Sequence, residues 1–470
     1  MRTVTTRPLK ARALAAGDFK DRRVLVVGLA RSGVAACKVL REAGAIVKAT
    51  DRRPAGDIAG VDGLRLGGVA VETGGHSLGF AEDCDLVVVS PGVPLEIDLL
   101  SWARGEGKTL LGEVELAWCL SQARFAAVSG TNGKTTTTSL LGAMVSRGNP
   151  RVRVGGNIGD PISALVAGLG PDWTAVIEIS SFQLDTCISF SPDVAVLLNI
   201  TPDHLDRYRS YADYFKSKQR LFANQGEGDF AVINFDDSEA MRAAEGVRAK
   251  KLYFSVRQEV PEGAFVRGKS VVVRVGETER ELFATGDLRI RGPHNLANGL
   301  ASSLAATVLD IAPDRIRAAA RDFEALEHRF EPVTTIGGVE VINDSKATNV
   351  DSLWWALQTA ERPVVLIAGG RDKGGSWDKV TDLVARKVKA IVAIGEARDK
   401  LVKAFSGGVR VEIASDLEAA VRMGLGLAAP GDLLLLSPGC ASYDMFKDFE
   451  HRGRAFKEIA MRIKAERGEI

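Results

Sequence analysis

A glycine-rich stretch beginning at Ser129, SGTNGKTTTT, has the residue types of a phosphate-binding loop. Its glycines and asparagine permit a tight bend whose backbone N–H groups face oxyanions, Lys134 supplies a positive charge, and Thr135 can ligate Mg²⁺. The usual loop has a glycine six residues before the lysine, where this chain has Val128. The predicted phosphate site comprises Gly130, Thr131, Asn132, Gly133, Lys134, Thr135 and Thr136.

A bound triphosphate also requires a metal ion, and the metal ion requires oxygen ligands. Glu178 lies near the end of the apolar stretch TAVIEIS, where a glutamate is costly to bury without a partner. This residue either faces solvent or binds metal. The string NITPDHLDRY follows the next apolar run, and its Asp203, His204 and Asp206 form either further ligands or an ordinary polar loop.

Lys218 occupies an unusual position in the segment YADYFKSKQRLF. It follows Tyr214 by four residues and precedes Phe222 by four, which places it within an apolar stripe at helical spacing. The lysine stem either extends past the stripe to solvent, or the amine is held beside a charged site.

A second glycine-rich turn, Gly28-Leu-Ala-Arg-Ser-Gly33, fits the dinucleotide fingerprint G-x-A-x-x-G. Asp51 ends the next predicted strand, where an acid that binds a ribose belongs. Ala30 replaces the middle glycine and leaves less room for a pyrophosphate against the backbone. The turn therefore indicates either a nucleotide site that differs from an NAD site or a strand–helix turn without a ligand.

Polar strings follow several apolar runs in the last third of the chain. EHRFE contains His328 and Arg329. NDSKATN at 343–349 has more hydrogen-bond donors and acceptors than an ordinary connecting loop, which indicates a binding site. GGRDKGG offers Arg371 and Lys373. SPGCASYDMFKDFEHRG offers Ser442, Phe446 and Phe449, and its aromatic residues also suit a helix core.

These motifs are expected at the ends of strands in three α/β blocks. Alternating apolar strands and amphipathic segments predict mainly parallel, doubly wound sheets. The first block has predicted strands at 24–27 and 45–50 around a helix at 32–43, and the last has a predicted strand at 338–342. The expected domains are 1–112, 113–325 and 326–470.

Bulk composition narrows the class of protein. The chain has 470 residues, 46% hydrophobic and 26% charged, with a net charge of +1. This balance gives no electrostatic case for nucleic acid or for an anionic membrane. We find no secretion signal and no run near the roughly 18 apolar residues of a membrane span. Five scattered cysteines without metal spacing indicate free thiols in a reducing cytoplasm.

Taken together, GTNGKTTT, EISSFQLD, NITPDHLDRY, HRFE, NDSKATN and SPGCASYDMFKDFEHRG resemble the Mur ligase family from about Val24 to about Phe456. The family loop has the short form G-T-N-G-K-[ST]-T, so Val128 is no departure from it. The strings NDSKATN and SPGCASYD point to the member of the family that adds D-glutamate.

The resemblance implies a three-domain fold: a Rossmann-like domain for a UDP substrate, a central P-loop ATPase domain with a mainly parallel sheet, and a Rossmann-like domain for the amino acid. It implies ATP-dependent ligation of D-glutamate to UDP-N-acetylmuramoyl-L-alanine through an acyl phosphate, in cytoplasmic peptidoglycan precursor synthesis. It also implies two Mg²⁺ sites. A monomer is expected, with no nucleic-acid partner and no membrane insertion.

The resemblance also implies roles for individual residues. Lys134, His204, Lys218 and Arg329 are the implied catalytic residues. Thr135, Glu178, His204 and Lys218 are the implied metal ligands, and Lys218 matches a lysine that the family carries as a carbamate. ATP contacts beyond the loop are implied for Asn295, Asn298, Arg329 and Asp344. UDP-substrate contacts are implied for Ala30, Arg31, Asp51, Arg52, Ser90, Gly92, Asn157 and Ser180. D-glutamate contacts are implied for Thr348, Lys373, Ser442 and Phe449.

Other functions are compatible with parts of this pattern. A sister ligase that adds another amino acid has the same phosphate loop, and so does folylpolyglutamate synthase, which would show no affinity for UDP. A P-loop regulatory ATPase with an NAD-binding first block belongs to another class. Binding of NAD or of a UDP-sugar distinguishes these alternatives.

Overall fold

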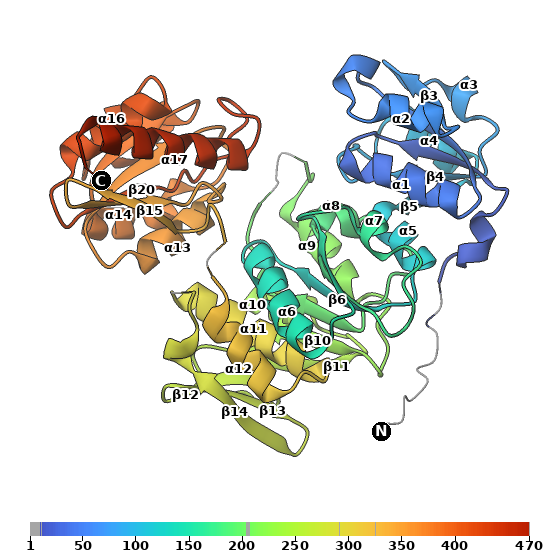
Figure 1. The fold of residues 1–470 in the computed structure, drawn as a ribbon, viewed down its shortest axis with the longest axis horizontal. Coiled ribbons are helices and arrows are strands. Elements are labelled where there is room, and N and C mark those ends of the chain that lie inside the picture. Colours follow the sequence, from blue (N-terminus) through green and yellow to red (C-terminus); the bar gives the residue numbers. More distant parts are fainter. Residues whose placement is uncertain (1–9, 11, 204–206, 291, 325, 470) are drawn as a thin grey trace. The chain divides into compact units, whose positions relative to one another are not determined.

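We describe a computed structural model of the chain, which covers all residues except 1–9, 11, 204–206, 291, 325 and 470. The chain divides into two compact units (Figure 1). The first comprises Met1–Ile200, Phe215–Asp287 and Asn298–Ala320, and the second comprises Thr201–Tyr214, Leu288–Ala297 and Arg321–Ile470.

The first unit begins with a five-stranded sheet in which every neighbouring pair of strands is parallel. Its order is β3-β2-β1-β4-β5, so the chain leaves β1 first toward one edge and later toward the other. The strands are β1 (Arg23–Val27), β2 (Ile46–Asp51), β3 (Ala70–Thr73), β4 (Leu86–Val89) and β5 (Thr109–Gly112). The helices are α1 (Arg31–Glu42), α2 (Val61–Leu66), α3 (Leu78–Ala81), α4 (Asp98–Gly105) and α5 (Glu113–Leu120). The predicted strands and helix of this block lie within one residue of the observed ones.

A nine-stranded sheet forms the rest of the first unit, in the order β14-β13-β12-β11-β10-β9-β6-β8-β7. Its strands are β6 (Arg124–Ser129), β7 (Val152–Gly156), β8 (Thr174–Glu178), β9 (Val194–Leu197), β10 (Phe230–Asn234), β11 (Lys250–Ser255), β12 (Gly263–Arg267), β13 (Ser270–Val275) and β14 (Thr278–Ala284). The other helices along this stretch of chain are α6 (Lys134–Gly148), α7 (Ile162–Val166), α8 (Ser181–Leu184), α9 (Tyr211–Gln219), α10 (Ser238–Ala243), α11 (Pro293–Val308) and α12 (Pro313–Asp322).

An antiparallel edge of this sheet was absent from the sequence-based expectation. β12, β13 and β14 pair antiparallel, whereas the remaining neighbours are parallel. Short turns join these strands, and Gly268 and Gly276 adopt positive φ in them (60° and 58°). Glycine reaches such angles without steric cost, so each turn can reverse the chain within a few residues.

The second unit has a six-stranded sheet in the order β15-β16-β20-β17-β18-β19. Its strands are β15 (Glu331–Ile336), β16 (Val339–Asn343), β17 (Val364–Gly369), β18 (Val388–Ile394), β19 (Arg410–Ile413) and β20 (Leu433–Leu436). Its helices include α13 (Val350–Thr359), α14 (Thr381–Lys387), α15 (Arg398–Phe405), α16 (Leu417–Leu427) and α17 (Phe449–Glu466).

The hairpin of β15 and β16 corrects the predicted strand at 338–342. Gly337 and Gly338 both have positive φ (55° and 76°) and form the turn, so β16 starts at Val339 and is preceded by an antiparallel partner. The sequence pattern did not predict that partner. The remaining strands of the sheet are parallel.

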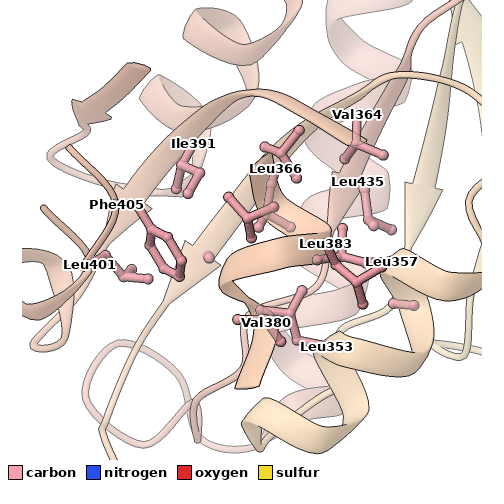
Figure 2. Close-up of a cluster of buried hydrophobic side chains, with 14 of the residues drawn as sticks. Leu353, Leu357, Val364, Leu366, Val380, Leu383, Ile391, Leu401, Phe405 and Leu435 are labelled. Carbon is pink, nitrogen blue, oxygen red and sulfur yellow. The ribbon is translucent and has the colours of Figure 1, made fainter. Parts of the chain in front are cut away.

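The core of the second unit lies on both faces of its sheet. Val364 and Leu366 of β17 pack in one cluster with α13, α14 and α15, as Figure 2 shows for Leu353, Leu357, Leu383 and Phe405. Val365 and Ile367 pack in a second cluster with α16 and α17. Successive residues of a strand point to opposite faces, and an all-apolar strand is therefore buried on both sides.

All five cysteines are free and buried. Burial raises the pKa of Cys37, Cys119 and Cys440 to about 12, so these thiols stay protonated at neutral pH. Among the helices in the described part of the chain, none combines the length and the apolar character needed to cross a membrane.

Candidate active site

The phosphate loop connects β6 to α6, as the sequence predicts. Gly130 and Gly133 adopt positive φ (152° and 84°), and a Cβ on Gly133 would lie 2.5 Å from Oδ1 of Asn298. The bend therefore needs glycine at both positions. Thr135 and Thr136 lie in the first turn of α6, where backbone N–H groups lack intrahelical partners and attract anions.

Asn199, which the sequence reading missed, holds the loop from the neighbouring strand. Its Oδ1 accepts hydrogen bonds from the backbone N–H groups of Thr131 (3.1 Å) and Asn132 (2.8 Å), and its Nδ2 donates to the Asn132 carbonyl (3.1 Å). Asn199 follows β9, which pairs directly with β6. The loop conformation is thus fixed by protein contacts before any nucleotide binds.

Two lysines converge on one carbonyl of this loop. Lys134 Nζ donates to the carbonyl oxygens of Gly130 (2.9 Å) and Thr131 (2.7 Å). Lys218 Nζ donates to the same Gly130 oxygen (2.9 Å) and to Ser129 Oγ (3.2 Å). Lys218 is only 2% exposed, so the alternative in which its stem reaches solvent is wrong.

Glu178 ends β8 beside the loop, because Glu178 pairs with Val128 of β6. It is 2% exposed, and its Oε1 accepts a hydrogen bond from Asn157 Nδ2 at 2.7 Å. Its Oε2 is buried and has no hydrogen-bond partner among the residues that the structure describes. A buried carboxylate oxygen left in this way is costly, and a cation would compensate it.

The other predicted metal ligands are less well defined. His204 and Asp206 lie outside the described residues, so their predicted role is not addressed by the geometry. Among the described residues, no three His, Cys, Asp or Glu side chains gather into a metal cluster. Among the predicted metal ligands that the structure describes, Glu178 is a carboxylate whose surroundings fit a metal ion.

A cavity of about 470 Å³ lies in the first unit, at the carboxyl ends of the five-stranded sheet. The switch point between β1 and β4 opens there, which is where doubly wound sheets bind ligands. Seven of the eight residues predicted to contact a UDP substrate line it: Ala30, Arg31, Asp51, Arg52, Ser90, Gly92 and Asn157. Ser180 does not; it caps α8, while Gln183 of that helix lines the cavity.

Asp51 is neutralised within the protein. Its carboxylate accepts hydrogen bonds from Leu29 N (2.7 Å) and from Arg53 Nε (3.0 Å), Nη2 (2.9 Å) and N (2.9 Å). Burial alone would raise its pKa, but these donors lower the pKa to about 2. Both oxygens are engaged, which disfavours the ribose-binding role that an NAD site would give this acid.

The predicted amino-acid residues lie in the second unit, around the string at 343–349. Phe449 begins α17, and the Lys346 ammonium sits over its ring, 3.5 Å from the centroid. Lys373 Nζ approaches Asp203 Oδ1 at 3.9 Å. Ser442 is buried, whereas Thr348 is half-buried.

Arg452 joins two strings that the sequence reading treated separately. Its buried guanidinium donates to the Ser345 carbonyl (2.9 Å), to Ser345 Oγ (3.0 Å) and to the Cys440 carbonyl (3.2 Å). Burial lowers its pKa to about 10, so it remains cationic at neutral pH. The signal was available in the sequence, because Arg452 lies between Phe449 and Phe456 on one helical face.

Asp344, which follows β16, lies beside the segment 328–330 that precedes β15. Asp344 accepts hydrogen bonds from Ser437 Oγ (2.8 Å) and Phe330 N (3.1 Å). The residue keeps some contact with solvent, yet protein atoms surround its carboxyl group, and this burial raises the pKa to about 7. His328 and Phe330 adopt positive φ (65° and 46°), a strained conformation that places Arg329 between them.

The two ATP-contacting asparagines differ in position. Asn298 lies on α11 beside Gly133 in the first unit, whereas Asn295 belongs to the second unit at the start of the same helix. The structure therefore brings together the phosphate loop, Glu178, Lys218 and Asn298 in one unit. It brings together Arg329, Asp344 and the amino-acid residues in the other.

Three family models match successive parts of the chain. They are described as the Mur ligase MurD-like N-terminal domain (residues 22–112), the Mur ligase middle domain (128–306) and the Mur ligase glutamate ligase domain (328–440). Relatives named UDP-N-acetylmuramoylalanine--D-glutamate ligase include one from Acidobacterium capsulatum, 43% identical over 94% of this chain and 97% of its own. Another, from Koribacter versatilis, is 42% identical over 95% and 98%.

Solved structures share the fold at lower identity. A pseudomurein peptide ligase type C from Methanothermus fervidus matches with a TM-score of 0.59 at 17% identity, covering 94% of this chain and all of its own. UDP-N-acetylmuramate-alanine ligase MurC from Thermotoga maritima matches with a TM-score of 0.58 at 17% identity over the same shares. MurF ligase from Thermotoga maritima, solved in complex with ADP, matches with a TM-score of 0.57 at 15% identity over 97% and 99%.

Proposed function

The chain belongs to the Mur ligase family, and from this premise we propose that it joins D-glutamate to UDP-N-acetylmuramoyl-L-alanine in an ATP-dependent reaction. The observation that carries the proposal is the similarity, over nearly the full length of both chains, to enzymes named for this ligation. A match to a MurD-like N-terminal domain favours this member over sister ligases and over an NAD-binding ATPase.

The reaction has two bond-forming steps. A carboxylate oxygen of the L-alanyl group attacks the γ-phosphorus of ATP, and the bond from phosphorus to ADP breaks. The amine of D-glutamate then attacks the carbonyl carbon of the acyl phosphate, loses a proton, and expels phosphate as the C–O bond breaks. Each step concentrates negative charge on phosphate oxygens, which must be stabilised by fixed positive groups.

Lys134 and the amino-terminal turn of α6 meet that requirement. The Lys134 ammonium now contacts two loop carbonyls, from which it can turn to phosphate oxygens. The N–H groups of α6 add partial positive charge at its amino terminus, and Asn199 holds the loop that leads into the helix. This preorganisation lets the loop bind the transferring phosphoryl group with little rearrangement.

Glu178 fits a resident Mg²⁺ ion through its Oε2, which has no hydrogen-bond partner among the described residues, and Thr135 in the first turn of α6 is the hydroxyl candidate. The ion, when bound, neutralises charge on the phosphate oxygens. Lys218 is proposed to carry a carbamate: its neutral amine attacks CO₂, a proton leaves, and an anionic group results. Lys218 contacts Ser129 Oγ, which in turn donates to the Ile179 carbonyl at 2.8 Å, one residue after Glu178.

The second unit is proposed to bind D-glutamate through Thr348, Lys373, Ser442 and Phe449. A side-chain carboxylate needs a cation and hydroxyl donors, and these residues provide them. Lys373→Ala should raise the KM for D-glutamate about tenfold or more and leave ATP binding unchanged. An unchanged KM for D-glutamate in this variant would place the carboxylate pocket elsewhere.

The domain limits 1–112, 113–325 and 326–470 are part of the proposal, and their support is that each range contains one of the three sheets. A cytoplasmic location is proposed because two of the proposed substrates, ATP and the UDP-linked acceptor, are nucleotides of the cytoplasm. Arg329 and Asp344 are proposed as ATP contacts.

The direct test is ligation by the purified chain with ATP, Mg²⁺ and UDP-N-acetylmuramoyl-L-alanine. Phosphate release and product mass should show turnover with D-glutamate and none with L-glutamate, L-lysine or meso-diaminopimelate. Without an amino acid, hydroxylamine should trap an acyl phosphate. Turnover with L-lysine or meso-diaminopimelate in preference to D-glutamate would make the chain a sister ligase.

A further inference from the structure

The cavity at the carboxyl ends of the five-stranded sheet extends from the β1–α1 turn to the residues that follow β2 and β3. Ala30 is the N-cap of α1, and the cavity also reaches Asp51 and Arg52 at the end of β2. In a sheet of this topology a diphosphate lies at the amino terminus of the first helix, and the nucleoside extends over the end of the second strand. Beyond that point the cavity wall includes His76, which follows β3 and which the sequence reading did not select.

His76 is held by a network at the ends of β2 and β3. Its Nδ1 lies 3.0 Å from Thr50 Oγ1, and Thr50 Oγ1 also lies 2.9 Å from Glu72 Oε2 and 2.9 Å from the Gly75 carbonyl. Glu72 accepts further hydrogen bonds from the Ser77 hydroxyl and, at 3.1 Å, from the Ser77 N–H. The ring is therefore fixed in position without a ligand.

The same network fixes the position of the proton on the ring. The Thr50 hydroxyl has one hydrogen, and a carboxylate and a carbonyl already compete to accept it. Its lone pairs are satisfied only if His76 Nδ1 carries a hydrogen and donates to it. In the neutral ring Nε2 is then a bare acceptor, and it is the nitrogen that remains for a ligand in the cavity.

We propose that His76 selects uracil as the base of the nucleotide substrate, by accepting a hydrogen bond from the uracil N3–H through Nε2. Cytosine has the same size but a bare nitrogen at position 3, so two acceptors would face each other. Arg52, on the same wall, supplies donors suited to the flanking uracil carbonyl oxygens. The inference rests on the proposed UDP-substrate role of the cavity and adds the residue that reads the base.

The charge state of the ring agrees with this assignment. Burial lowers the pKa of His76, although Asp51 and Glu72 act in the opposite direction, and Arg52 lowers it further. The ring is therefore neutral at pH 7, as an acceptor must be. Asp51 itself cannot take the N3–H, because Arg53 and Leu29 occupy both of its oxygens.

The test is equilibrium titration of the full chain with UDP, CDP and 3-methyl-UDP. The wild-type chain should bind UDP at least about tenfold more tightly than either analogue, since each analogue leaves the His76 acceptor unpaired in the complex. In His76→Ala the affinity for UDP should fall about tenfold, and the three ligands should bind within about twofold of one another. ATP titration of the same variant controls for folding.

A second variant acts on the proton position alone. Thr50→Val keeps the volume of the side chain but removes the oxygen that fixes Nδ1–H, so the preference for UDP over CDP should shrink while ATP binding is retained. An equal penalty for N3 methylation in wild type and His76→Ala would overturn the role of His76. A wild-type chain that binds no UDP at all would instead overturn the UDP-substrate role of the cavity.

Discussion

The first unit contains two strand–loop–helix devices of the same backbone design, and they differ in how their charges are satisfied. Beside the β1–α1 turn, at the end of β2, Asp51 pairs with Arg53 and accepts a hydrogen bond from Leu29 N of the turn. At the β6–α6 loop, two lysines share the Gly130 carbonyl, and one oxygen of Glu178 has no hydrogen-bond partner in the described part of the chain. We infer that the β1–α1 turn serves to hold a substrate. The β6–α6 loop keeps charged groups that a bound nucleotide and metal ion would satisfy during the reaction.

Lys134→Ala should lower the ligation rate by on the order of 10² or more, because a charge that stabilises the transferring phosphoryl group is lost. UDP binding, measured by titration, should not change. Lys38→Ala on α1 is the matched control, since Lys38 is exposed, and its rate should equal that of the wild type. A Lys134→Ala enzyme with near-wild-type turnover would remove the distinction between the two loops.

Lys218→Ala should be nearly inactive yet folded, because Lys134 still satisfies the buried Gly130 carbonyl. Short carboxylic acids such as formate or acetate should partly restore activity by replacing the carbamate oxygens. Lys218→Glu should recover poorly, since its shorter stem cannot reach as far. Lys216→Ala, an exposed lysine on the same helix, is the control. Full activity of Lys218→Ala without added acid would exclude the carbamate.

Glu178→Gln should weaken the response of the ligation rate to Mg²⁺ and at the same time stabilise the fold. The Mg²⁺ concentration for half-maximal rate should rise about tenfold or more, because an anionic ligand is lost. The free energy of unfolding without Mg²⁺ should rise by about 1 kcal/mol, because an uncompensated buried charge is removed. Enzyme assays across a Mg²⁺ series and thermal melts check both. A lower melting temperature with an unchanged Mg²⁺ requirement would show that Glu178 is structural.

Asp51→Asn should lower the free energy of unfolding. The pKa of Asp51 determines how this effect depends on pH. The folded pKa, about 2, lies below the ordinary value of 3.8, so the ionised carboxylate stabilises the fold above about pH 4. With the exposed Arg53 discounted for solvent screening, the loss at pH 7 should be about 1–2 kcal/mol. Denaturant titrations should show this difference shrinking as the pH falls from about 4 to about 2. A difference independent of pH would point to packing.

Local patterns in the sequence were sufficient to place the phosphate loop between a strand and a helix. They were also sufficient to place Lys218 within an apolar stripe. The loop is a continuous segment, and its glycines report the backbone angles directly, as Gly133 does. Lys218 is identified by its spacing from Tyr214 and Phe222 along one helix. Such features depend on neighbours within a few residues, so periodicity and residue type determine them.

Features that depend on distant segments were missed. Asn199 reaches the phosphate loop from 67 or 68 residues away, and His76 meets Thr50 from 26 residues away, and no pattern in either stretch specifies these contacts. The antiparallel edge at β12–β14 was missed for a different reason, because its alternating residues resemble any half-buried strand. Arg452 is intermediate: its helical position was visible, but its carbonyl partners lie on other loops.

The five buried thiols have a practical consequence for labelling chemistry. Because a protonated, inaccessible thiol reacts slowly with maleimides, the native chain offers a low background for site-specific dyes. Leu66 in the first unit is 90% exposed and Ile413 in the second is 48% exposed, so a cysteine at each position would be readily modified. A donor–acceptor pair on these two sites turns the spacing of the two units into a fluorescence signal, which can be followed as ATP, UDP-substrate and D-glutamate are added in turn.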